Sequence, residues 1–155
     1  MNLFTRTPEF QRWLDAYDAD HAHPWTHRTH AVGIPLVVLS TMGFMNLLPG
    51  HGWIWGLRVG WTEVALSLLI AFYAHHDLRI ALLGAPLGAA LAVGSRLIAW
   101  PWHSGIFILA WGIQVFGHAV WEKNRPAFFT NLVQLLVGPA YFLAACLGIR
   151  STPTG

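Results

Sequence analysis

Five long apolar segments constrain the fold of this chain more than any other feature of its sequence. Their approximate bounds are 31–48, 61–75, 80–98, 104–121 and 132–149. Each holds about 15 to 19 residues, close to the ~20 that a helix needs to cross a bilayer. In lipid a helix satisfies its own backbone hydrogen bonds, whereas an open strand does not. The segments therefore predict an all-α, multi-span integral membrane helix bundle with about five apolar helices.

Composition supports a lipid environment and narrows the class of protein. Only 10% of the residues are charged, against about 25% in soluble domains. The net charge is +2 without a basic stripe, which excludes a nucleic-acid partner. A single cysteine, Cys146, excludes an intrachain disulfide and a cysteine-based zinc site. We expect one transmembrane helical domain over 1–150 and a disordered tail over 151–155.

The N-terminal region predicts a short amphipathic helix over 8–19. Thr7 is a suitable N-cap, and Pro8 suits the first helical position. The apolar stripe of this helix consists of Phe10, Trp13, Leu14 and Tyr17. Because the stripe carries Trp and Tyr, it favours a position in the membrane interface.

The distribution of Lys and Arg orients the bundle with its N-terminus in the cytoplasm. In this topology the cytoplasmic side carries Arg6, Arg12, Arg28, Arg79, Lys123 and Arg125. The opposite side carries Arg58, Arg96 and Arg150. The histidines that fall on the cytoplasmic side are His21, His23, His27, His30, His75, His76 and His118. The lipid bilayer is thus an expected partner, with most histidines near one of its faces.

A histidine and a carboxylate end the fourth apolar segment. His118 and Glu122 are four residues apart and share a helix face, with Gln114 one turn earlier. Such groups are costly beside lipid unless they are paired or bound to a metal. We interpret His118 as a metal ligand and Glu122 as a second ligand or as the carboxylate that fixes the imidazole tautomer. The alternative is a His–Glu pair that only stabilises the helix end.

Further histidines precede the first apolar segment and follow the second. His27 and His30 share a helix face, and Pro24 allows His21 to fold back towards His30. This group fits metal ligands and a solvated connector equally well. The pair at 75–76 provides one further candidate ligand at most, because adjacent helical residues point about 100° apart. Asp77 is alternatively the N-cap of the next helix.

Histidine and carboxylate ligands suit Fe(II), Zn(II) or Mn(II), and open positions on iron allow O₂ to bind. The sequence contains no nucleophilic serine elbow, phosphate-binding glycine loop or dinucleotide fingerprint. A di-iron lipid hydroxylase or desaturase stays open, and it would require His27, His75 and His76 as additional ligands. A non-enzymatic metal-binding membrane protein stays open as well. Small residues in the apolar segments would permit a homodimer.

Two blocks of the sequence form a pattern with a known counterpart. The first block contains Tyr17, His21, Pro24, His30, Gly33 and Pro35. The second contains Trp111, Gln114, Gly117, His118, Glu122, Arg125, Pro126, Ala127, Asn131 and Leu132. Together they resemble the Mpo-like family of membrane-bound 2-hydroxy fatty acid dioxygenases of phytosphingosine degradation. Thr26 stands where that family often carries Asn, and the pair at 75–76 has no counterpart in it.

The resemblance implies an Fe(II) enzyme that uses O₂, without 2-oxoglutarate, to shorten a 2-hydroxy fatty acid by one carbon. It implies His21, His30 and His118 as metal ligands, with Glu122 as a fourth ligand or an orienting residue. Glu122 and Arg125 are the expected catalytic residues. Arg125, or as the weaker candidate Arg28, would pair with the substrate carboxylate. The expected location is the inner membrane of a bacterium, or the endoplasmic reticulum of a eukaryote.

Overall fold

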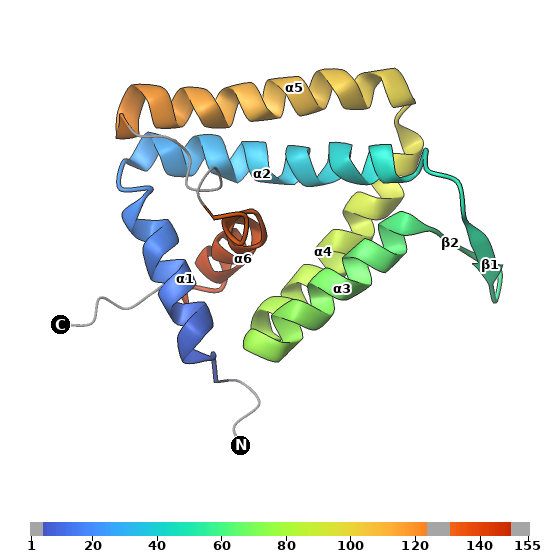
Figure 1. Cartoon of the computed structure of the whole chain (residues 1–155), viewed down its shortest axis with the longest axis horizontal. Coiled ribbons are helices and arrows are strands. Elements are labelled where there is room, and N and C mark those ends of the chain that lie inside the picture. The colour runs from blue at the N-terminus through green and yellow to red at the C-terminus, as the bar shows by residue number, and fades with distance from the viewer. Residues whose placement is uncertain (1–4, 124–130, 150–155) are drawn as a thin grey trace.

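The computed structural model describes residues 5–123 and 131–149. In chain order the helices are α1 (Pro8–Ala19), α2 (Pro24–Met45), α3 (Trp61–His76), α4 (Leu78–Leu97), α5 (Trp100–Gly117) and α6 (Gln134–Cys146). A π-helical turn, η1 (His118–Glu122), continues α5. A two-stranded antiparallel hairpin, β1 (Gly52–Ile54) and β2 (Leu57–Val59), lies between α2 and α3. Apart from this hairpin every element of the described chain is a helix, which confirms the predicted all-α class (Figure 1).

The structure supports the predicted membrane spans only in part. All five apolar segments are helical, but α3 has 16 residues and α6 has 13. Within the described residues, two helices are long and apolar enough to cross a membrane, Leu78–Leu97 and Trp100–Glu122. Helix α2 also has sufficient length, but its first turns carry Arg28 among several histidines. Five membrane-spanning helices are therefore not confirmed.

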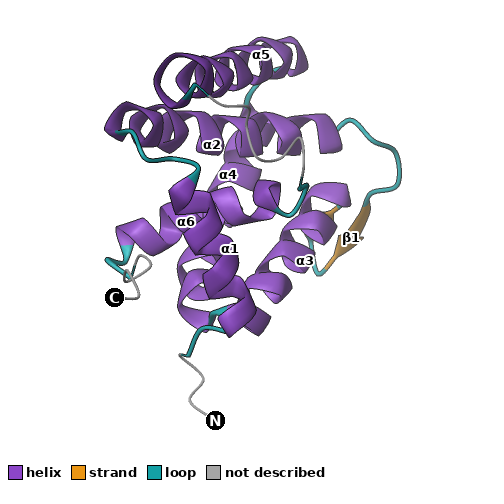
Figure 2. Cartoon of the chain, turned by 60° about the vertical axis from the view of Figure 1, so that its left-hand side comes forward, coloured by secondary structure: helices purple, strands orange, loops and turns teal. Residues whose placement is uncertain are grey.

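The two longest helical rods lie side by side and run in opposite directions. Figure 1 shows α5 along α2, with the other helices on the far side of α2, and Figure 2 shows the same layering from another direction. Glycines allow the close approach of the two helices. A Cβ atom on Gly33 of α2 would lie 2.6 Å from Cγ of Gln114, and one on Gly117 would lie 2.7 Å from Oγ1 of Thr29. This packing brings the start of α2 next to the end of α5.

The first helix, α1, has the predicted bounds and cap. The Thr7 hydroxyl accepts a hydrogen bond from the Phe10 amide, and Pro8 begins the helix. Its apolar stripe is buried except for the partly exposed Trp13, and Phe10 and Leu14 are inaccessible to solvent. The stripe packs on α3, α4 and α6, contacting Tyr73 among others. The expectation that this stripe faces the membrane interface is corrected, because the stripe forms part of the core.

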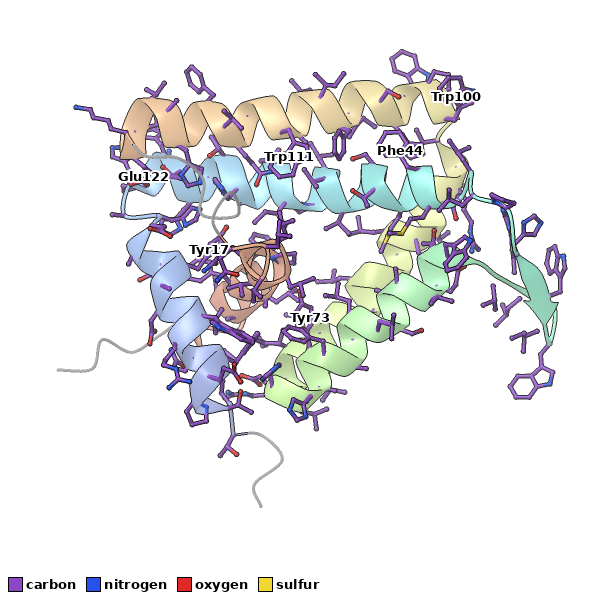
Figure 3. All side chains as sticks on the ribbon, viewed as in Figure 1. Tyr17, Phe44, Tyr73, Trp100, Trp111 and Glu122 are labelled. Carbon is purple, nitrogen blue, oxygen red and sulfur yellow. The ribbon has the colours of Figure 1, made fainter. Side chains whose placement is uncertain are left out.

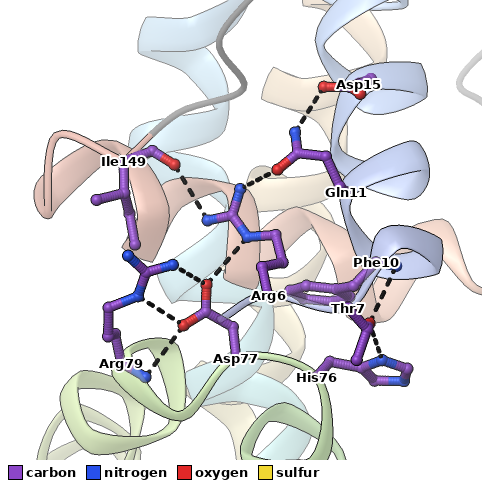
Figure 4. Close-up of polar contacts among 9 residues, drawn as sticks. All are labelled: Arg6, Thr7, Phe10, Gln11, Asp15, His76, Asp77, Arg79 and Ile149. Carbon is purple, nitrogen blue, oxygen red and sulfur yellow. Dashed lines mark hydrogen bonds and ion pairs between the residues drawn. The ribbon is translucent and has the colours of Figure 1, made fainter. Parts of the chain in front are cut away.

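A buried ion cluster connects the turn between α3 and α4 to both ends of the described chain (Figure 4). The Asp77 carboxylate accepts from Arg6 at 3.0 Å and from Arg79 at 2.8 Å. The other end of the Arg6 guanidinium donates to the carbonyl of Ile149. Asp77 also caps α4 by accepting from the Arg79 backbone amide, as the N-cap alternative predicted. Burial alone would raise the pKa of Asp77, but the hydrogen bonds from Arg79 and Arg6 outweigh it and hold the pKa below its ordinary value.

Candidate metal centre

Three histidines from distant parts of the chain meet at the end of the α2–α5 pair. They are His21 in the α1–α2 loop, His30 on α2 and His118 where α5 passes into η1. All three are buried, and one ring nitrogen from each lies within 4.8 Å of the other two. Within the described residues this is the one group of three or more His, Cys, Asp or Glu that could hold a metal ion in this way.

Backbone carbonyls hold two of these imidazoles in a defined orientation. Nδ1 of His21 lies 2.6 Å from the carbonyl oxygen of Tyr17, and Nδ1 of His30 lies 2.9 Å from that of Thr26. A carbonyl only accepts, so each Nδ1 carries the proton and each Nε2 keeps its lone pair. The two Nε2 atoms lie 3.3 Å apart. Metal-bound histidines have this arrangement, in which the outer nitrogen donates to a carbonyl and the inner one faces the ion.

The electrostatics of the site favour neutral imidazoles. Burial, together with the neighbouring His30, lowers the pKa of His21 to about 3. Burial likewise lowers the pKa of His30 to about 4. A metal ion binds the neutral form of histidine, so these two side chains need not lose a proton at neutral pH before they bind one.

Local backbone structure explains how the rings converge. Pro24 begins α2, and the loop before it turns the His21 ring onto Tyr17, with a centroid separation of 3.9 Å. His118 lies at the junction of α5 with the π-helical turn η1. Single π turns within α-helices occur frequently at functional sites. The predicted return of His21 towards His30 is therefore observed, with ring centroids 4.6 Å apart.

Glu122 contacts the loop that carries His21. Its Oε1 atom accepts a hydrogen bond of 2.8 Å from the His23 backbone amide. The Glu122 carboxylate is not part of the group of histidine ring nitrogens that lie within 4.8 Å of one another. Figure 3 shows Glu122 at the same end of the molecule as Tyr17, opposite Trp100. The carboxylate thus ties η1 to the α1–α2 loop.

The described residues supply no partner for the substrate carboxylate at the site. Arg125 lies outside the described residues. Arg28, the weaker candidate, is exposed and stacks over the ring of Trp25 at 4.4 Å. Within the described chain, no arginine or lysine lines the cavities next to the three histidines.

The other histidines lie apart from the three. His76 shares a hydrogen bond of 2.8 Å with the Thr7 hydroxyl and stacks on Phe10, while His75 is exposed. His27 stacks on Tyr141 and lines a cavity of about 240 Å³ on one side of His21 and His30. The structure therefore does not bring the 75–76 pair to the centre, and it leaves His27 beside the centre.

A cavity of about 80 Å³ opens directly onto the three histidines. Among its lining residues are two amides, Gln114 on α5 and Gln134 at the start of α6. The Gln134 side-chain oxygen is buried and has no hydrogen-bond partner among the described residues. Sequence reasoning gave Gln134 no role. A polar residue within the apolar segment 132–149 was the available signal.

Fold and site define a helical protein with a candidate all-histidine metal centre. The family model described as 2-hydroxy-palmitic acid dioxygenase Mpo1-like matches residues 7–150, and the chain belongs to this family. It is 28% identical over 134 residues to the 2-hydroxy-palmitic acid dioxygenase MPO1 of Saccharomyces cerevisiae. That alignment covers 84% of this chain and 74% of the relative. No solved structure matches the chain. The family resemblance seen in the sequence is thereby confirmed.

Proposed function

We propose that the chain is an Fe(II)-dependent dioxygenase that shortens 2-hydroxy fatty acids by one carbon. The observation that carries this proposal is the convergence of three buried imidazoles within 4.8 Å in a member of the Mpo1-like family. The reaction balances with O₂ as the oxidant. The C1–C2 bond breaks, C2 becomes the new carboxyl carbon, C1 leaves as CO₂, and one water forms, so no 2-oxoglutarate or other reductant is required.

The donor set fits the proposed metal. Three neutral imidazole nitrogens suit Fe(II), and they also accept Zn(II) or Mn(II). His21, His30 and His118 would hold the ion, and two of them already have their outer nitrogens bonded to carbonyls. Bound there, Fe(II) would supply a centre at which a 2-hydroxy carboxylate and O₂ react side by side.

The chain itself would orient the substrate head. In this proposal the unpartnered oxygen of Gln134 accepts a hydrogen bond from the 2-hydroxyl group. The burial of the three histidines limits their own contact with bulk water. Arg125 would pair with the substrate carboxylate, as the sequence predicts. Glu122 would be either a metal ligand or an orienting residue. Its hydrogen bond to the His23 amide supports the orienting role.

Membrane placement completes the proposal. Exposed tryptophans occur at both ends of the α2–α5 pair. Trp25 lies at the start of α2, and four others lie on the β1–β2 hairpin and at the start of α5, at the opposite end (Figure 1): Trp53, Trp55, Trp100 and Trp102. Tryptophan is enriched at membrane interfaces. The α5–η1 rod between the two ends has 23 residues, about 35 Å at the helical rise and near the thickness of a bilayer core. We place the centre near the cytoplasmic edge, in a bacterial inner membrane or the endoplasmic reticulum of a eukaryote.

The two-metal alternative receives little support. A di-iron hydroxylase or desaturase would need a second set of ligands near the first. Within the described residues only one candidate group is found, and His76 is bonded to Thr7 instead. A non-enzymatic metal-binding protein would have the same three ligands, so turnover distinguishes it.

The test is a single-product assay. Detergent-purified protein is loaded with Fe(II) without oxygen and then given 2-hydroxypalmitate and O₂. We expect the acid one carbon shorter by mass spectrometry, lost in His118→Ala and retained in the His76→Ala control. A product of unchanged length, or no product from fully loaded protein, would refute the proposed reaction.

A further inference from the structure

A separate apolar cavity lies between α2, α3, α4 and α6. Its volume is about 230 Å³. Every described residue that lines it is apolar, except Tyr73. The Tyr73 hydroxyl cannot donate a hydrogen bond to a ligand, because it already donates to the carbonyl of Leu136 at 2.8 Å. A cavity with this lining favours a hydrocarbon and disfavours a charged head group.

This apolar cavity adjoins the cavity at the three histidines. Ile34 and Val38 of α2 and Pro139 of α6 line both. A molecule with a polar head at the histidines could therefore extend its tail past these three side chains. Together the two cavities fit an acid with a long hydrocarbon chain whose polar groups are gathered at the carboxyl end.

We propose that the apolar cavity receives the acyl chain of the substrate and sets the chain-length preference. This inference rests on the proposed function, which supplies the polar head. Burying a methylene favours binding by about fourfold, so acids should bind more tightly with each carbon until the cavity is full. Beyond that length, further carbons should add no affinity.

Glycines on α4 let side chains of α3 and α6 pack closely on α4 at the wall of the cavity. A Cβ atom on Gly88 would lie 2.5 Å from Cδ1 of Leu66, and one on Gly84 would lie 3.1 Å from Cδ1 of Leu143. Gly88 and Leu66 line the apolar cavity without lining the one at the histidines. They therefore belong to the wall beyond the shared residues, where the later carbons of a long chain would lie.

The experiment compares Val38→Trp with Val32→Trp. Val38 stands in the wall shared by both cavities, whereas Val32 is an exposed residue of the same helix that lines neither. Binding of unreactive octanoate and palmitate to metal-free protein is measured by displacement of a fluorescent fatty acid. We expect Val38→Trp to weaken palmitate binding by about tenfold or more and octanoate binding by a smaller factor. Val32→Trp should bind both acids as the unmodified protein does.

Each outcome decides the proposal. Equal palmitate affinity in Val38→Trp and Val32→Trp would overturn it and favour the cavity beside His27. Equally strong displacement by a phosphatidylcholine with the same chain would also overturn it, because the cavity would then hold bilayer lipid. If Val38→Trp fails to fold, Leu66→Ala replaces it. Leu66→Ala should increase the longest chain length at which an added carbon still raises the affinity. An unchanged length limit in Leu66→Ala would contradict the proposal.

Turnover separates this proposal from the reaction on which it rests. Unmodified protein that binds acids with the expected length dependence but makes no shortened product would refute the dioxygenase and leave the acyl cavity supported. Shortened product with a length profile unaltered in Val38→Trp would leave the dioxygenase supported and refute the acyl cavity.

Discussion

The imidazole rings of His21 and His118 lie edge to face with their centroids 4.7 Å apart. One ring belongs to the first interhelical loop and the other to the end of α5. Their proximity depends on α2, which carries His30 between them and packs along α5. The candidate centre is therefore a product of tertiary packing, and variants that disturb the packing should disturb the centre.

The approach of α2 to α5 is testable with two glycines on one helix. A Cβ atom at Gly117 would lie 2.7 Å from the Thr29 hydroxyl oxygen, whereas one at Gly112 has open space. Gly117→Ala should destabilise the protein by about 1–3 kcal/mol through overpacking, and it should weaken metal binding. Gly112→Ala should be neutral or stabilising by up to about 1 kcal/mol. Thermal unfolding in detergent measures both, and equal effects would contradict the packing argument.

Glu122 can be assigned as a ligand or an orienting residue by two substitutions. Its carboxylate accepts from the His23 amide, and a glutamine side chain keeps an acceptor oxygen at that position. We expect Glu122→Ala to lose about 10- to 100-fold in metal affinity, as second-sphere changes do, and Glu122→Gln to lose much less. Fe(II) affinity from anaerobic titration is the measurement. If both variants lose affinity equally, the carboxylate acts as a ligand. Glu63→Gln, at the Gly60 amide far from the centre, is the control.

Gln134 should affect stability and substrate binding in opposite directions. Gln134→Leu removes a buried oxygen without a partner among the described residues, so the free energy of unfolding should rise by about 1–3 kcal/mol. The same change should raise KM for 2-hydroxypalmitate by about 2- to 13-fold, the equivalent of one hydrogen bond. Palmitate, which lacks the 2-hydroxyl, should bind equally to both proteins. A KM that does not change would remove Gln134 from the substrate site.

Asp77 should give the fold an acid-sensitive component. Its pKa in the folded protein lies below the ordinary value of 3.8, so its ion pairs stabilise the fold fully above about pH 4. That stabilisation is lost as the pH falls through the folded-state pKa. Asp77→Asn should cost about 3–5 kcal/mol at neutral pH, because it leaves Arg6 buried without a charged partner. The stability difference between the two proteins should shrink below about pH 4. A difference independent of pH would contradict this assignment.

Much of the secondary structure follows from local sequence. The cap at Thr7, Pro8 at the start of α1 and the five apolar segments all correspond to observed helices. The β1–β2 hairpin was not predicted, because its two-residue turn needs a positive φ at Trp55 as well as at Gly56. Tryptophan is a poor indicator of that conformation. Apolarity identified the helices but could not show which of them are long enough to span a membrane.

The three histidines of the candidate site could be predicted from the sequence, but the residues around them could not. His21, His30 and His118 were named from their spacing and the family pattern, whereas spacing alone could not exclude the pair at 75–76. His76 lies elsewhere because α1 packs against α3 and presents Thr7 to it. The position of Gln134 depends on how α6 enters the bundle, which no local pattern encodes. Long-range packing determines these features.

Iron stoichiometry tests the central claim most directly. Protein reconstituted anaerobically with Fe(II), freed of excess metal and analysed by elemental analysis should hold one iron per chain. His21→Ala, His30→Ala and His118→Ala should each lose that iron, while His76→Ala should keep it. Two irons per chain, or one iron retained in folded His118→Ala, would contradict a single centre built from these three side chains.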